Sequence, residues 1–154
     1  YYYAIREMTN LADFQEDPEW IAAKLNHTIT AKDAKNALTA LIELNLLARN
    51  PDGRLKLSNG HVDTSSDLAD EGLKRFHQQL LTKAHDSVRA ISPPLREISG
   101  TTFAIKLANL ERAKRLIRKF RLDLCNLLEE SDAEAVFHLE VAFFPLTKIE
   151  RKPE

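Results

Sequence analysis

The sequence has little of what disulfide scaffolds, zinc sites and membrane spans require. Its 154 residues include a single cysteine, Cys125, so neither an internal disulfide nor a cysteine-based zinc site is available. No apolar run approaches the roughly 18 residues of a membrane-spanning helix, and no signal peptide is recognisable. We therefore expect a soluble cytoplasmic protein with no membrane attachment.

An excess of one charge is also missing, since 22 Lys and Arg balance 23 Asp and Glu for a net charge of -1. That balance excludes a generally basic nucleic-acid coat and a polybasic membrane binder. Glycine is scarce, with four residues, and the stretch 58–67 is the most polar of the chain. We interpret this stretch as a linker. It predicts one domain over residues 1–60 and a second over residues 61–154.

The first sixty residues predict three helices followed by a β-hairpin. The first helix is expected over 1–14. A second, over 18–25, follows an aspartate suited to the N-cap and begins with proline. A third, over 30–44, opens on a threonine with an acid three residues later, close to a capping box. Two short alternating runs over 46–57 then flank Pro-Asp-Gly, a strong turn signal. This order predicts a winged helix-turn-helix.

In a winged helix-turn-helix the third helix enters the major groove of DNA. The predicted DNA-contacting residues lie near the start of that helix and on the hairpin: Thr28, Thr30, Lys32, Lys35, Asn36, Thr39, Arg49, Arg54 and Lys56. Lys and Arg attract phosphates whatever the base sequence, and Asn reads adenine with two hydrogen bonds. However, seven cations against eight acids in the first sixty residues is a poor electrostatic footprint for DNA. A protein-interaction scaffold that never touches DNA is therefore the alternative.

The remaining residues predict an α-β-α-β domain. Helices are expected over 67–90, where two prolines follow, and over 110–127, where apolar residues recur at strict spacings of three and four. Alternating apolar residues predict half-buried strands over 101–107 and 137–143. The fold class is therefore α+β: a winged helix-turn-helix followed by an α-β-α-β domain whose small sheet is covered by helices.

Two strands make a poor free-standing sheet, and the edge of the last strand needs a partner. Pairing with another copy of the chain, or with a part of the protein upstream of this sequence, would supply one, and we predict a homodimer. The alternative is a monomer whose sheet is completed by the N-terminal segment.

The one local basic patch lies on the second of these helices, with six cations in ten residues between 112 and 121. Arg112, Arg115 and Lys119 follow one side of the helix. We favour a solvated surface whose aliphatic stems cover the edge of the core. The alternative is a sensor in which these three side chains hold a small phosphorylated ligand.

Catalytic patterns are weak, so we expect neither an enzyme nor a bound cofactor or metal. The five histidines have no metal-ligand spacing, and neither a nucleophile elbow nor a phosphate-binding glycine loop occurs. Cys125, inside a predicted helix beside apolar residues, is typical of a small core residue. His77 is interpreted as a buried hydrogen-bonding residue.

Several short motifs occur in a specific order along nearly the whole chain: Ala4-Ile5-Arg6-Glu7, Asp17-Pro18-Glu19-Trp20-Ile21-Ala22, Leu44-Asn45-Leu46-Leu47 before Asp52-Gly53-Arg54, Phe76-His77-Gln78-Gln79-Leu80, Ile98-Ser99-Gly100-Thr101-Thr102 and Phe144-Pro145-Leu146-Thr147. The order resembles the uncharacterised regulator-like bacterial family noted as expanded in Fibrobacter and Bdellovibrio, carried as a domain of unknown function. Asn45 stands where that family often has Gly before the wing, and a left-handed helix end tolerates Asn.

The resemblance implies a bacterial transcriptional regulator in which another helix-turn-helix-like region precedes the part seen here. This agrees with a chain that opens on Tyr1 rather than Met, which we take to be a fragment. It implies no catalytic residue. We predict a winged-helix module joined to a dimerisation or sensing domain, with DNA binding shared with the upstream region.

Overall fold

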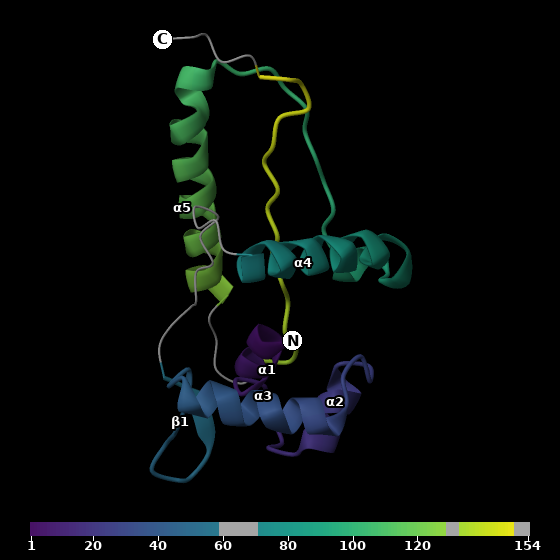
Figure 1. The fold of residues 1–154 in the computed structure, drawn as a ribbon, viewed down its shortest axis with the longest axis vertical. Coiled ribbons are helices and arrows are strands. Elements are labelled where there is room, and N and C mark those ends of the chain that lie inside the picture. Colours follow the sequence, from purple (N-terminus) through teal and green to yellow (C-terminus); the bar gives the residue numbers. More distant parts are fainter. Residues whose placement is uncertain (59–70, 129–132, 150–154) are drawn as a thin grey trace. The chain divides into compact units, whose positions relative to one another are not determined.

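The computed structural model describes residues 1–58, 71–128 and 133–149. The chain divides into two compact units, Tyr1–Asp63 with Leu124–His138, and Thr64–Asp123 with Leu139–Glu154. The elements in the described ranges are α1 (Tyr2–Met8), α2 (Pro18–Lys24), α3 (Ala31–Glu43), β1 (Leu47–Arg49), β2 (Leu55–Leu57), α4 (Glu71–Ala90), the 3-10 helices η1 (Pro93–Leu95) and η2 (Leu107–Asn109), and α5 (Leu110–Leu128) (Figure 1). Helices with one small antiparallel sheet make the fold α+β, as predicted.

Helix α1 is shorter than predicted, because it ends at Met8 and not near residue 14. The Thr9 hydroxyl donates to the Arg6 carbonyl at 2.8 Å, and the next amides close tight turns onto carbonyls three residues back. The backbone then joins another segment. Ala12 N–H donates to the Ala133 carbonyl at 3.0 Å, and Ala133 N–H donates to the Asn10 carbonyl at 3.2 Å. This long-range pairing overrides a local helical pattern.

The predicted start signals of α2 and α3 are confirmed. Asp17 caps α2, since its carboxylate accepts from the Glu19 amide at 3.1 Å, and Pro18 occupies the first turn, where no amide donor is needed. At the start of α3 the Asp33 amide donates to the Thr30 hydroxyl at 3.1 Å, and the Thr30 amide donates to the Asp33 carboxylate at 3.0 Å. The capping box is therefore complete.

The predicted hairpin is also confirmed: β1 pairs with β2 antiparallel, with Leu47 opposite Leu57 and Arg49 opposite Leu55. Gly53 has a φ of 82°, a conformation that L side chains rarely adopt. The Asn50 side-chain oxygen accepts from the Arg54 amide at 2.9 Å and closes the loop.

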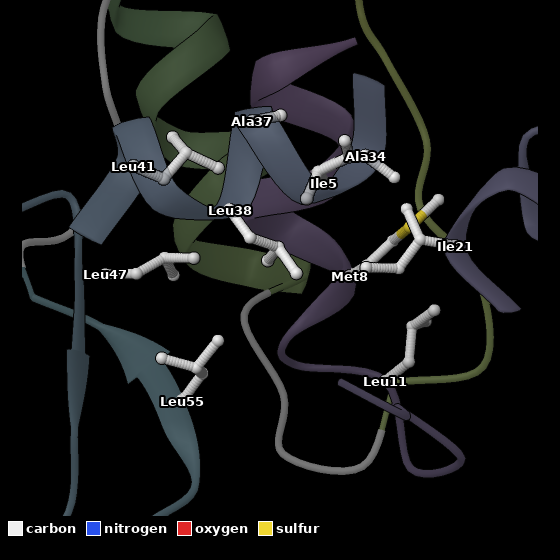
Figure 2. Packing of buried hydrophobic residues seen from close by; sticks show 10 residues of the cluster. All are labelled: Ile5, Met8, Leu11, Ile21, Ala34, Ala37, Leu38, Leu41, Leu47 and Leu55. Carbon is white, nitrogen blue, oxygen red and sulfur yellow. The ribbon is translucent and has the colours of Figure 1, made fainter. Parts of the chain in front are cut away.

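The core of the first unit lies within residues 1–58. Its buried apolar side chains come from α1, α2, α3, the hairpin and the segment after α1 (Figure 2): Ile5, Met8, Leu11, Ile21, Ala34, Ala37, Leu38, Leu41, Leu47 and Leu55. Four of them lie on α3, spaced by one, three and four residues, which is one face of a helix. The packing of that face leaves the opposite side of α3 to solvent.

One charged side chain is also fully buried in this unit. Arg6 on α1 is 0% exposed and forms an ion pair with Glu7, whose side chain is 32% exposed. The sequence of α1 did not indicate this burial, because an arginine next to an apolar residue in a helix usually faces solvent.

The two strands predicted for the second half, over 101–107 and 137–143, are wrong for the described residues. Residues 97–105 and 134–149 form no backbone–backbone hydrogen bond with another described residue. The end of the first predicted strand is part of a 3-10 helix, Leu107–Asn109. The Phe103 and Phe143 rings nevertheless stack, with centroids 6.3 Å apart. Alternation indicates an extended segment with one apolar side, but a strand also needs a neighbour to supply its hydrogen bonds.

Helices α4 and α5 agree with the sequence prediction where they are described. α4 ends at Ala90 before the two prolines, and α5 runs from Leu110 to Leu128. The predicted beginning of α4 at residue 67, and the linker over 59–67, lie outside the described residues. His77 on α4 forms a hydrogen bond, as predicted, with its Nδ1 3.0 Å from the Glu140 carboxylate, but it is only partly buried, where a buried residue was predicted.

Candidate nucleic-acid interface

Helix α3 presents a polar side opposite its buried stripe. Lys32, Lys35, Asn36 and Thr39 are all exposed, and their spacing of three and four residues places them along one side of the helix. The Thr39 hydroxyl donates to the Lys35 carbonyl at 3.1 Å. The structure thus brings together four of the predicted DNA-contacting residues on one exposed surface.

The hairpin contributes two further exposed cations, Arg54 and Lys56, and a third that is engaged locally. The Arg49 guanidinium donates to both Glu16 carboxylate oxygens, at 2.9 and 2.5 Å, and to the Gly53 carbonyl at 2.7 Å. Hydrogen bonding to Glu16 raises the pKa of Arg49 above its ordinary value. Arg49 therefore ties the hairpin to the loop before α2.

Thr30 likewise has a local partner. Its hydroxyl donates to the Asp33 carboxylate at 2.6 Å and accepts from the Asp33 amide. These hydrogen bonds from Thr30 lower the pKa of Asp33 below its ordinary value, and the charge of Lys32 contributes in the same direction. Thr30 and Asp33 thus fix the first turn of α3, from which Lys32 and Lys35 project.

The lowered pKa of Asp33 predicts a dependence of stability on pH. A carboxylate with a depressed pKa in the folded state stabilises that state above the ordinary aspartate pKa of about 3.9 and loses this effect as the pH falls further. We expect the native protein to be more stable than Asp33→Asn at neutral pH, and the difference to shrink as the pH falls from about 5 to about 2.5. Urea unfolding followed by fluorescence of the single tryptophan, Trp20, measures it. A difference independent of pH would contradict the assignment.

Ion pairing sorts the cations of the first unit into two groups. Arg6 pairs with Glu7, Lys24 with Asp13 at 2.7 Å, and Arg49 with Glu16. The remaining four cations of residues 1–58 all lie on α3 or the hairpin, and none has an ion-pair partner among the described residues: Lys32, Lys35, Arg54 and Lys56. The near-neutral total charge of this part of the sequence concealed that local concentration, because ion pairing between distant residues cannot be read from composition.

The segment between α2 and α3 is a tight turn in the left-handed region. Asn26 and His27 both have a φ of 52°, and the His27 amide donates to the Ala22 carbonyl at 2.8 Å. Asn45, after α3, has a φ of 54°, so the asparagine there does adopt a left-handed helix end, as expected. These turns set the directions in which α3 leaves α2 and in which the chain enters β1.

The second predicted site lies on α5. Arg112, Arg115 and Lys119 are exposed there, and Lys119 forms an ion pair with Asp123 at 2.6 Å. Their positions along one exposed side agree with a solvated helix surface. None of these side chains is buried in a concave site.

Within residues 1–58, 71–128 and 133–149, no group of three or more His, Cys, Asp or Glu side chains is placed to hold a metal ion. Cys125 is a partly buried free thiol. None of the helices described has both the length and the apolar character needed to cross a membrane.

Comparison with known proteins gives one match. The family model described as "Domain of unknown function (DUF4423)" matches residues 1–146. No curated protein and no solved structure matches the sequence. The match confirms the uncharacterised domain family that the order of the short motifs indicated.

Proposed function

This chain belongs to the DUF4423 family of domains of unknown function, and we propose that its first unit is a winged helix-turn-helix that binds duplex DNA as part of a bacterial transcriptional regulator. In this proposal α2 and α3 are the helix-turn-helix pair, and the β1–β2 hairpin is the wing. The observation that carries it is the placement of the four cations without ion-pair partners among the described residues, all on α3 or the hairpin.

The chemistry of α3 suits the major groove. Lys32 and Lys35 supply positive charge for phosphates, and the Asn36 amide has the donor and acceptor that bind adenine through two hydrogen bonds. Lys and Arg contacts position the protein without reading bases, so we assign register to the lysines and base recognition to Asn36. Thr39, one turn further along the same side, can contact either a base or a phosphate.

The hairpin supplies the other two of these four cations. Arg54 and Lys56 are exposed on β2 and the loop before it, where a wing contacts the DNA backbone. We assign Arg49 and Thr30 supporting roles, because their polar atoms are engaged with Glu16 and Asp33. Arg49 holds the wing and Thr30 holds the start of α3.

The proposal is tested with two lysine variants that differ only in position. Lys35→Ala removes a proposed phosphate contact, so we expect weaker binding to mixed-sequence duplex DNA and a slope of log K against log salt smaller by about 1. Lys24→Ala is the matched control. Its ammonium pairs with Asp13 and lies 4.9 Å from the centre of the Trp20 ring on α2, so we expect unchanged affinity. Fluorescence anisotropy at several salt concentrations measures both.

Equal losses in the two variants would mean that charge anywhere on the unit matters, and would contradict the α3 surface. Absence of DNA binding by the native protein would favour the alternative function, a module that docks another protein. Under that reading the α3 face would be a protein contact and not a groove-binding surface.

A further inference from the structure

A small hollow lies beside the core of the first unit. It has a volume of about 270 Å³, and all the described residues that line it belong to this unit. Six of them are apolar and come from α1, the segment after it, the end of α2 and the segment after α5: Ala4, Met8, Leu11, Leu25, Ala135 and Val136. Met8 and Leu11 also belong to the buried core (Figure 2). A mainly apolar hollow with few polar groups is typical of small-molecule sites, whose volumes begin at about 300 Å³.

The wall formed by residues 134–136 is held at both ends. Before it, the Ala133 carbonyl accepts from the Ala12 amide at 3.0 Å, and the Ala133 amide donates to the Asn10 carbonyl at 3.2 Å. At its other end Val136 packs against the core. The remaining lining residues lie on or next to α1 and α2. Because contacts within the unit fix these walls, the hollow is formed before a ligand arrives, which lowers the entropic cost of binding.

Two charged side chains complete the lining, and one of them is already neutralised. The Lys24 ammonium lies 2.7 Å from the Asp13 carboxylate and 4.9 Å from the centre of the Trp20 ring, so Lys24 offers the hollow mainly its aliphatic stem. The Glu134 carboxylate is exposed and has no hydrogen-bond or ion-pair partner among the described residues. The uncompensated charge at the hollow is therefore negative, and it complements a cation.

We propose that this hollow binds a small amphipathic amine, with its apolar body against Met8, Leu11 and Leu25 and its ammonium group beside the Glu134 carboxylate. Removal of the apolar body from water drives the binding. A charge-assisted hydrogen bond to Glu134 selects the cation. The site uses no residue of α3 or the hairpin, so it does not depend on whether this unit binds DNA.

An NMR titration of the chain with three six-carbon probes tests the proposal: n-hexylamine, n-hexanol and n-hexanoate. The amine is protonated at neutral pH, as a lysine side chain is, so the probes share a hydrocarbon chain and differ in charge. We expect the amide shift changes to centre on the lining residues. We expect the amine to bind about two- to fivefold more tightly than the alcohol, which is the gain from an exposed ion pair, and hexanoate to bind most weakly.

Two substitutions of exposed residues locate the site. Glu134→Gln removes the charge and keeps the shape, so we expect the amine and the alcohol to bind equally. Ala135→Phe places a ring in the hollow, and we expect the binding of all three probes to be lost. Glu19, an exposed residue of α2 that does not line the hollow, provides the matched control, so Glu19→Gln is expected to keep the native preference. The dispersion of the amide signals shows that each variant is folded.

Equal affinities of the native chain for hexylamine and hexanol would overturn the proposal, as would shift changes spread over the surface and not centred on the lining residues. A preference for the amine that survives Glu134→Gln, or binding that survives Ala135→Phe, would do the same. None of these outcomes bears on the affinity for DNA, so this proposal and the proposed function are tested separately.

Discussion

Replacing Leu41 by alanine is expected to destabilise the first unit by about 2–5 kcal/mol, the range for a buried leucine whose removal leaves a cavity. Leu41 is 1% exposed and lies in the core among residues of α1, α3 and the hairpin (Figure 2). Leu41 is one of the buried residues of α3, the recognition helix of our proposal. Urea unfolding followed through Trp20, which packs against the same core, measures the change.

The matched control is Leu44→Ala, at the end of the same helix. Leu44 is 67% exposed, so its truncation leaves no cavity, and we expect a change within about 0.5 kcal/mol. Comparable losses at the two leucines would show that the buried face of α3 is not the one described.

Replacing Arg6 by alanine is expected to cost about 2–4 kcal/mol, because the change opens a cavity and removes the ion-pair partner of Glu7. Arg6 is 0% exposed, so its aliphatic stem fills space in the core of the unit. Glu7 is 32% exposed and can be hydrated once the guanidinium is gone, which places the loss below that of a wholly buried pair.

Arg6→Met separates volume from charge. Methionine retains most of the buried volume, so if packing dominates we expect a loss below about 1.5 kcal/mol. Losses as large as those of Arg6→Ala would show instead that the guanidinium and its polar contacts determine the stability. The midpoint of urea unfolding distinguishes the two outcomes.

Features set by neighbouring residues were predictable from the sequence. Asp17 and Thr30 cap the helices they were expected to cap, and the Pro-Asp-Gly loop joins β1 to β2. Such signals act within a few residues, so no knowledge of the rest of the fold is needed. The exposed side of α3 follows in the same way from its apolar spacing.

Features that depend on distant residues were not predictable. Helix α1 ends at Met8, and the chain after it forms a β-bridge between Leu11 and Ala133. The alternating segments around Phe103 and Phe143 are not strands, because no described neighbour forms backbone hydrogen bonds with them. Burial of Arg6 is a third example, since only the assembled core determines which side of α1 is enclosed.

The candidate interface shows the same division. Lys32, Lys35 and Asn36 lie together on an exposed surface as their spacing indicates. The partner of Arg49 could not be predicted in this way. Glu16 lies 33 residues before Arg49, and no periodic pattern links the two. Which cations have no ion-pair partner among the described residues therefore becomes clear only when the ion pairs elsewhere in the unit are known.

The dependence of DNA affinity on salt tests the proposed function most directly. If the four cations on α3 and the hairpin contact phosphates, log K for a mixed-sequence duplex falls linearly with log salt with a slope of about -3 to -4 per chain. Anisotropy titrations of the chain at four salt concentrations would give that slope. No measurable binding at low salt, or an affinity that does not change with salt, would contradict the account.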